Sequence, residues 1–100
     1  MATYSFTAPL ARWDSSQGAW WYVKVSEDVA DEVEDTLHGP RRGFGAVRVR
    51  VTCGSTTWET SMFPSKELAS FMLPVKQAVR RAESLEEGLH ATYEITVLQG

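Results

Sequence analysis

The chain has 100 residues, of which 43% are hydrophobic and 23% are charged. These fractions are those of an ordinary globular domain and exclude a disordered or collagen-like chain. Since a domain typically takes roughly 100–200 residues, the length predicts one domain over residues 1–100. Thirteen acidic and ten basic side chains give a net charge of −3, which removes any general electrostatic attraction to nucleic acids or anionic membranes.

The cysteine content and the first residues bear on the cellular compartment. Cys53 is the single cysteine, so neither an internal disulfide nor a cysteine-based zinc site can form. The first six residues lack the basic and apolar segments of a signal peptide. No apolar run reaches the roughly 18 residues that a membrane-spanning helix needs. We therefore expect a cytoplasmic protein without membrane association.

Residues 3–10 predict a first strand, because apolar and polar residues alternate along them. Pro9 has no N–H for a strand ladder, which places this strand at a sheet edge or beside a bulge. Turn-forming residues at 14–18 lead to a second strand at 19–25, which is rich in aromatic and β-branched residues. The first two strands are therefore expected to form a hairpin.

An acidic helix is expected to follow this hairpin. Ser26 is a good capping residue for its start, and Val29, Val33 and Leu37 repeat at the spacing of one helical face. The sequence His-Gly-Pro at residues 38–40 is typical of a helix end.

Residues 45–53 show the clearest strand pattern of the chain, with valines on one face and arginines on the other. Gly54 can take the positive φ of a type II′ turn, so residues 56–63 are expected to return as the paired strand. Pro64 is expected to end that strand.

The last third of the chain predicts a short strand at 71–73, a basic helix and a final strand at 91–98. Pro74 suits the first turn of the helix, whose apolar stripe runs to Ala82. Closing the sheet on itself would remove exposed strand edges. We therefore predict a mainly β protein with two helices, built as a small closed or pseudo-closed β-barrel of about six strands.

Several segments together, in this order, resemble a known family. They are the opening strand that ends near Trp13, the GAWWYV strand at 18–23, the acidic helix, GFGAVRV at 43–49, WETSMFP at 58–64 and LPVKQAVRRA at 73–82. They are similar to the bacterial family catalogued as domain of unknown function nineteen-oh-five. The resemblance implies a double-split β-barrel, the architecture also found in AbrB- and MazE-type transcription factors. The family has no established activity, so the resemblance implies a fold but no function.

Four tryptophans in 100 residues favour a small-ligand site, since aromatic side chains with a few polar groups line typical pockets. Trp21 alternates with apolar residues and is expected in the core. The residues singled out for binding are Trp58, Ser61, Lys76 and Arg80, because a cation pair four residues apart can hold a carboxylate or phosphate. The alternative, that the tryptophans only fill the core and Ser61 bonds locally, stays open.

A second hypothesis is a nucleic-acid-binding or regulatory module of the AbrB-like kind. Converging basic side chains can neutralise several phosphates. The candidates are Arg41, Arg42, Arg48, Arg50 and Arg81. The competing interpretation is that Arg48 and Arg50 solvate a strand face and pair with Glu59 or the acidic helix, and the net charge favours it.

A third hypothesis is a protein-interaction domain that acts through the acidic helix, with Asp31 and Glu34 as its contact residues. The expected partner is thus a small molecule, whereas nucleic acid is disfavoured and the sequence names no protein partner. The chain is expected to be a monomer or a homodimer.

Catalysis has the weakest support in the sequence. His38 and His90 have no metal-ligand spacing between them, and Cys53 alternates with valines as a core thiol does. Ser61 lacks the flanking glycines of a nucleophile elbow. We therefore expect no enzyme, no metal and no cofactor.

Overall fold

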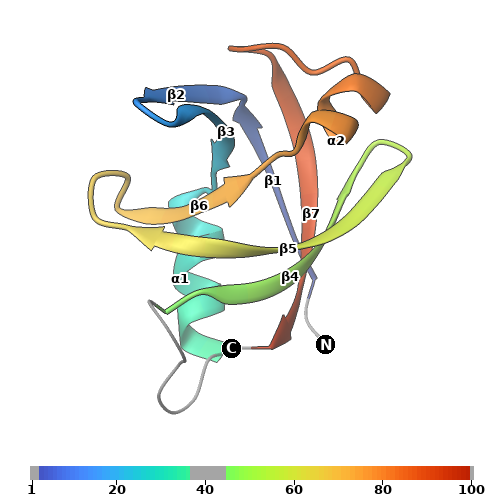
Figure 1. Ribbon diagram of the computed structural model, residues 1–100. Coiled ribbons are helices and arrows are strands. Elements are labelled where there is room, and N and C mark those ends of the chain that lie inside the picture. The colour runs from blue at the N-terminus through green and yellow to red at the C-terminus, as the bar shows by residue number, and fades with distance from the viewer. Residues whose placement is uncertain (1–2, 37–44, 100) are drawn as a thin grey trace.

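Seven antiparallel strands form one strongly curled sheet in the computed structural model, which describes residues 3–36 and 45–99 (Figure 1). The order of strands across the sheet is β1-β7-β4-β5-β6-β3-β2. In chain order the elements are β1 (Thr3–Pro9), β2 (Ala11–Ser15), β3 (Gly18–Lys24), α1 (Glu27–Thr36), β4 (Val47–Cys53), β5 (Thr56–Ser65), β6 (Ser70–Pro74), α2 (Gln77–Ala82) and β7 (His90–Gln99). The prediction of a mainly β protein with two helices is confirmed for the part of the chain described.

The interior of the curl is lined by the alternate residues that the sequence predicted. Val47, Val49 and Val51 of β4 are completely buried, as are Tyr93 and Ile95 of β7. The outer face is polar, with threonine hydroxyls paired across neighbouring strands. Sheets with one face in the core and one in water show this alternation.

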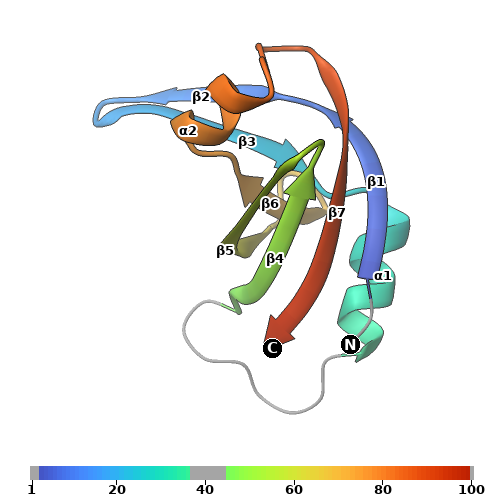
Figure 2. The same cartoon turned by 90° about the vertical axis from the view of Figure 1, so that its right-hand side faces the viewer.

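β1 and β2 form the two edges of the sheet, although Leu10 alone separates them in the chain. β1 pairs with β7, and β2 pairs with β3. The two run on as one long strand that bends between them, and its second half extends away from the curl with β3 (Figure 2). The sheet is therefore a curled half-barrel whose edges are joined through the chain, and the predicted closed barrel of six strands is not confirmed.

The prediction that residues 3–10 pair with residues 19–25 in a hairpin is wrong. β3 pairs with the additional strand β2, and β1 pairs with β7 from the other end of the chain. Alternation shows which face of a strand is buried but not where the strand bends or which strand lies beside it. The expected edge position of Pro9 is confirmed, because β1 ends the sheet.

Two prolines lie inside strands where the sequence predicted a boundary. Pro64 does not end β5 but pairs with Phe71 of β6. β4 pairs with β5 only as far as Met62, so Pro64 lies beyond the second ladder, and a missing N–H is tolerated there. Pro74 does not open the second helix but is the last residue of β6, and α2 begins at Gln77.

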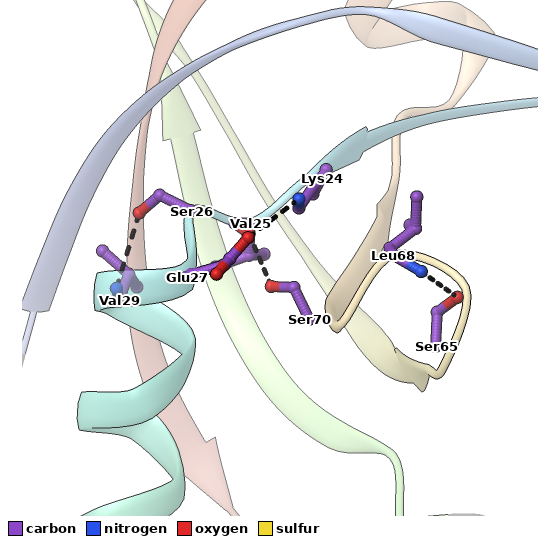
Figure 3. Close-up of polar contacts among 8 residues, drawn as sticks. All are labelled: Lys24, Val25, Ser26, Glu27, Val29, Ser65, Leu68 and Ser70. Carbon is purple, nitrogen blue, oxygen red and sulfur yellow. Dashed lines mark hydrogen bonds and ion pairs between the residues drawn. The ribbon is translucent and has the colours of Figure 1, made fainter.

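The helix α1 covers the open side of the curl between β1 and β6. Ser26 caps it as predicted, since its Oγ accepts a hydrogen bond from the Val29 N–H at 3.4 Å (Figure 3). Val29 and Val33 face the core. Residues 37–40, expected to contain the end of this helix, lie outside the described residues.

Side-chain hydrogen bonds fix the β5–β6 hairpin beside the start of α1. The Ser70 Oγ donates to the Val25 carbonyl at 2.5 Å, and the Leu68 N–H donates to the Ser65 Oγ at 3.3 Å (Figure 3). Ser70 is buried, and the carbonyl of Val25, directly after β3, satisfies its hydroxyl.

Candidate ligand pocket

A pocket of about 240 Å³ lies between β3, β5 and the start of α2. Its walls include three tryptophans, one acid and two cations: Trp20, Trp21, Trp58, Glu59, Lys76 and Arg80. The structure thus places Trp58, Lys76 and Arg80, three of the four residues singled out from the sequence, around one concavity.

Ser61 is the fourth of those residues, and it does not line this pocket. Trp58 points to the core face of β5 and is 6% exposed, whereas Ser61 lies three residues on, on the other face, opposite Arg48. Because side chains of a strand alternate, Thr60 shares the face of Trp58, and Thr60 lines the pocket. The hydroxyl that β5 contributes to the pocket is therefore that of Thr60 and not that of Ser61.

Arg80 is held against the pocket wall by two contacts. Its guanidinium carbon lies 4.4 Å from the centre of the Trp21 ring, and its Nε–H donates to the Val75 carbonyl at 3.3 Å. Burial, and secondarily the neighbouring Arg81, lowers the pKa of Arg80, but a guanidinium stays protonated in proteins. The bond to Val75 leaves the Nη donors for a ligand.

Trp21 lines the pocket, although the sequence predicted it to lie in the core. It is half-buried and packs against the core cluster, as expected, but its ring also forms the surface on which Arg80 stacks. Arg12 of β2 lies 5.7 Å from the centre of the same ring. Stacking of a cation on tryptophan contributes about 0.5–2 kcal/mol, so Trp21 positions the charge of Arg80.

The rim of the pocket carries charges of both signs. Lys76 is exposed at the residue before α2, and Glu59 projects from β5. The Glu59 carboxylate is 3.2 Å from an Arg50 nitrogen and 3.8 Å from an Arg48 nitrogen. These exposed pairs each contribute at most about 1 kcal/mol, but they offset the charge of Glu59 beside the pocket.

Of the arginines proposed for nucleic-acid binding, the described ones lie on β4 and on α2. Arg48 and Arg50 flank Glu59, which is the pairing that the competing interpretation expected. Arg81 is exposed on α2. Arg41 and Arg42 lie outside the described residues.

A second concavity of about 460 Å³ lies between α1 and the β5–β6 hairpin. Asp31 and Glu34, named for the protein-interaction hypothesis, line it together with Lys66 and Phe71. The acidic helix therefore presents its carboxylates beside a cation and an apolar surface.

Cys53 and His90, the cysteine and the histidine of the described residues, lie outside the pocket lining. Cys53 is buried, and its burial, with the nearby Glu83, raises the pKa of the thiol, which suits an inert core residue. His90 is exposed at the start of β7, and His38 is not among the described residues.

Within residues 3–36 and 45–99 no three His, Cys, Asp or Glu side chains gather so as to hold a metal ion. Neither helix of that part is long and apolar enough to cross a bilayer.

The fold and this pocket define a small mainly β domain with an aromatic cavity at the rim of a curled antiparallel sheet. The family model described as Domain of unknown function (DUF1905) matches residues 6–95, and the chain belongs to this family. The resemblance inferred from the sequence is thereby confirmed. A comparison with curated proteins yields no match.

Proposed function

We propose that this domain is a non-catalytic binding module for a small ligand with one anionic group and one flat or aromatic group. The observation that carries the proposal is the shared pocket of Trp21, Trp58, Lys76 and Arg80. Guanidinium and ammonium groups bind carboxylates and phosphates, and indole rings pack on flat apolar groups.

The size and charge of the pocket narrow the ligand further. Its volume of about 240 Å³ is below the roughly 300–1,000 Å³ of pockets for drug-sized molecules, which favours a ligand of a single ring. Two cations, Lys76 and Arg80, line the pocket, and the carboxylate of Glu59 at the rim is paired with Arg50 and Arg48, so the pocket favours a ligand with an anionic group.

Arg80 offers a direct test, because its neighbour Arg81 is a matched control. Benzoate and phenyl phosphate serve as charged probes, and benzyl alcohol serves as the neutral one. We expect the charged probes to raise the thermal unfolding midpoint of the wild type and of Arg81→Gln. In Arg80→Gln the affinity is expected to fall about 10- to 100-fold, since a hydrogen bond to a charged group is lost.

Lys76→Gln is the second variant, because Arg80→Gln also removes the stacking on Trp21. Lys76 is exposed, so its substitution leaves the fold intact and weakens the charged probes by a smaller factor than Arg80→Gln does. The proposal is rejected if neither charged probe shifts the midpoint, or if the shifts in Arg80→Gln equal those in the wild type.

A further inference from the structure

The outer edge of β2 carries exposed side chains, and beside it both backbone groups of Leu10 are bonded to Gly88 and Leu89. Residues 12–15 of β2 are all exposed. The large hydrophobic residues exposed in the described part of the chain are Trp13 at 58%, Trp20 at 46% and Leu89 at 45%. Trp13 lies directly opposite Trp20 on the hairpin, and the Leu89 carbonyl accepts a hydrogen bond from the Leu10 N–H beside β2. All three therefore lie at or next to this one edge.

The ladder determines which backbone groups point outward from that edge. The Trp21 carbonyl accepts from the Val75 N–H, so Trp21 directs its backbone towards β6. Its neighbour Trp20 therefore faces β2, and Trp13 opposite it faces β3, because hydrogen-bonding direction alternates along a strand. Arg12 and Asp14, on either side of Trp13, direct their N–H and C=O groups to the outer edge.

The side chains along this edge complement themselves under a two-fold axis. If a second copy of β2 pairs antiparallel about Trp13, Arg12 lies opposite Asp14 of the second copy on both sides of the axis. Opposite charges at directly paired positions stabilise a sheet. The four outward N–H groups meet four outward C=O groups in the same register. We propose that the chain forms a homodimer in which the two β2 strands pair antiparallel about Trp13.

The dimer also covers the exposed side chain of Trp13 and keeps Arg12 and Asp14 paired with opposite charges. Trp13 meets Trp13 of the second copy as a non-hydrogen-bonded pair, the type in which side chains approach most closely. The ion pair between Arg12 and Asp14 within one chain, at 3.2 Å, exchanges its partners without loss of charge pairing. The other edge, β1, is protected by Pro9 and by the packing of α1, so it offers no comparable surface.

The order of the side chains along β2 indicates that the partner is a second copy of this chain. Arg-Trp-Asp read in the reverse direction presents Asp-Trp-Arg, which is its own complement in an antiparallel pair. An isologous interface requires this self-complementarity, and symmetric dimers are the commonest oligomers.

Charge exchange at the axis tests the register without disturbing the core. We expect the wild type to sediment as a dimer at high concentration. Arg12→Asp opposes two carboxylates at both sides of the axis, and Asp14→Arg opposes two guanidinium groups, so each should weaken the dimer at least 10-fold. The double variant Arg12→Asp with Asp14→Arg restores opposite charges and should dimerise within a few-fold of the wild type. Circular dichroism of each single variant checks that the fold is retained.

A crosslink at the axis tests the same register independently. Trp13→Cys places two thiols opposite one another, and oxidation should join them quickly. In Ser15→Cys the two thiols are four positions apart along the strands, roughly 13 Å, and should crosslink much more slowly. The proposal is overturned by a wild type that stays monomeric at all concentrations, by a dimer that survives both single charge variants, or by equal crosslinking at the two positions. None of these outcomes depends on ligand binding in the pocket.

Discussion

The strands β4 and β2 belong to the same sheet and have opposite characters. β4 lies between β7 and β5, and every second residue is a fully buried valine. β2 lies at an edge, and all of its residues after Ala11 are exposed. The difference indicates that the free energy of folding is concentrated around β4 and β7, whereas the β2–β3 hairpin leaves Trp13 and Trp20 exposed. Trp21 faces the pocket, and Trp13 lies at the open edge.

The largest expected effect separates the two regions by truncation. Ile95 of β7 is completely buried, so Ile95→Ala should lower the free energy of unfolding by about 2–5 kcal/mol. Trp13→Ala removes a larger side chain, but an exposed one. It should change the free energy of unfolding by no more than about 0.5 kcal/mol. Urea unfolding at low protein concentration, where the chain is monomeric, measures both. An equal cost for the two substitutions would abolish the distinction between core and hairpin.

Alkaline pH probes the core region through Tyr93. Its side chain is fully buried, and its hydroxyl has no hydrogen-bond partner among the described residues. Burial, and to a smaller extent the nearby Cys53, raises the pKa of Tyr93 to about 12, whereas an exposed tyrosine ionises near about 10. Below pH 10 both the folded and unfolded chains keep the proton, so this group leaves stability unchanged. As the pH rises from about 10 to 12 only the unfolded chain ionises, and the free energy of unfolding should fall by about 2–3 kcal/mol.

Tyr93→Phe is the control for that titration. It removes the ionisable group, so most of the loss between about pH 10 and 12 should disappear. It also removes a buried hydroxyl without a partner, so stability at neutral pH should stay level or rise by about 1 kcal/mol. Guanidinium unfolding at a series of pH values measures both effects. A slope in Tyr93→Phe as steep as in the wild type would show that another group causes the alkaline loss.

A smaller effect is expected where α2 is anchored to the turn between β4 and β5. Gly54 has φ +59°, as the predicted turn requires, and a Cβ there would lie 2.0 Å from the Glu83 Oε1. The Glu83 carboxylate accepts a hydrogen bond from the Thr56 hydroxyl at 2.5 Å. Gly54→Ala should therefore lower the free energy of unfolding by about 1–2 kcal/mol through backbone strain, and by a further increment through displacement of Glu83.

Gly88→Ala is the matched control for Gly54→Ala. Gly88 also has a positive φ, +86°, but a Cβ there would meet no atom within 4 Å, so only backbone strain is expected. The difference between the two alanine variants in thermal unfolding reports the contact with Glu83. Equal costs would mean that this contact does not hold α2 in place.

Much of the local structure could be predicted from the sequence, because each strand carries its own alternation. The strands at 45–53, 56–63, 71–73 and 91–98 are found within two residues of their predicted bounds. The bend at Leu10 could not be predicted, since Phe6, Ala8 and Leu10 continue the same buried face up to it. Nor does any local pattern pair β1 with β7, which follows it by more than eighty residues.

The sequence predicted the kinds of residue in the candidate site, tryptophan with lysine and arginine, better than the individual residues. Lys76 and Arg80 were selected by their spacing near a tryptophan strand, and the structure places both beside Trp58. Ser61 was included for its proximity in sequence, although strand alternation directs it to the other face from Trp58. Trp21 was assigned to the core, since half-buried and fully buried aromatic residues have the same pattern along a strand.

By itself, the sequence determined which face of each strand is apolar, where α1 begins and where the glycine turn between β4 and β5 lies, because these depend on neighbours within a few residues. Only the tertiary structure decided that one continuous segment supplies both edges of the sheet, and that Arg80 stacks on Trp21. Such contacts depend on how the sheet curls, and its curvature results from the packing of all seven strands together rather than from any one of them.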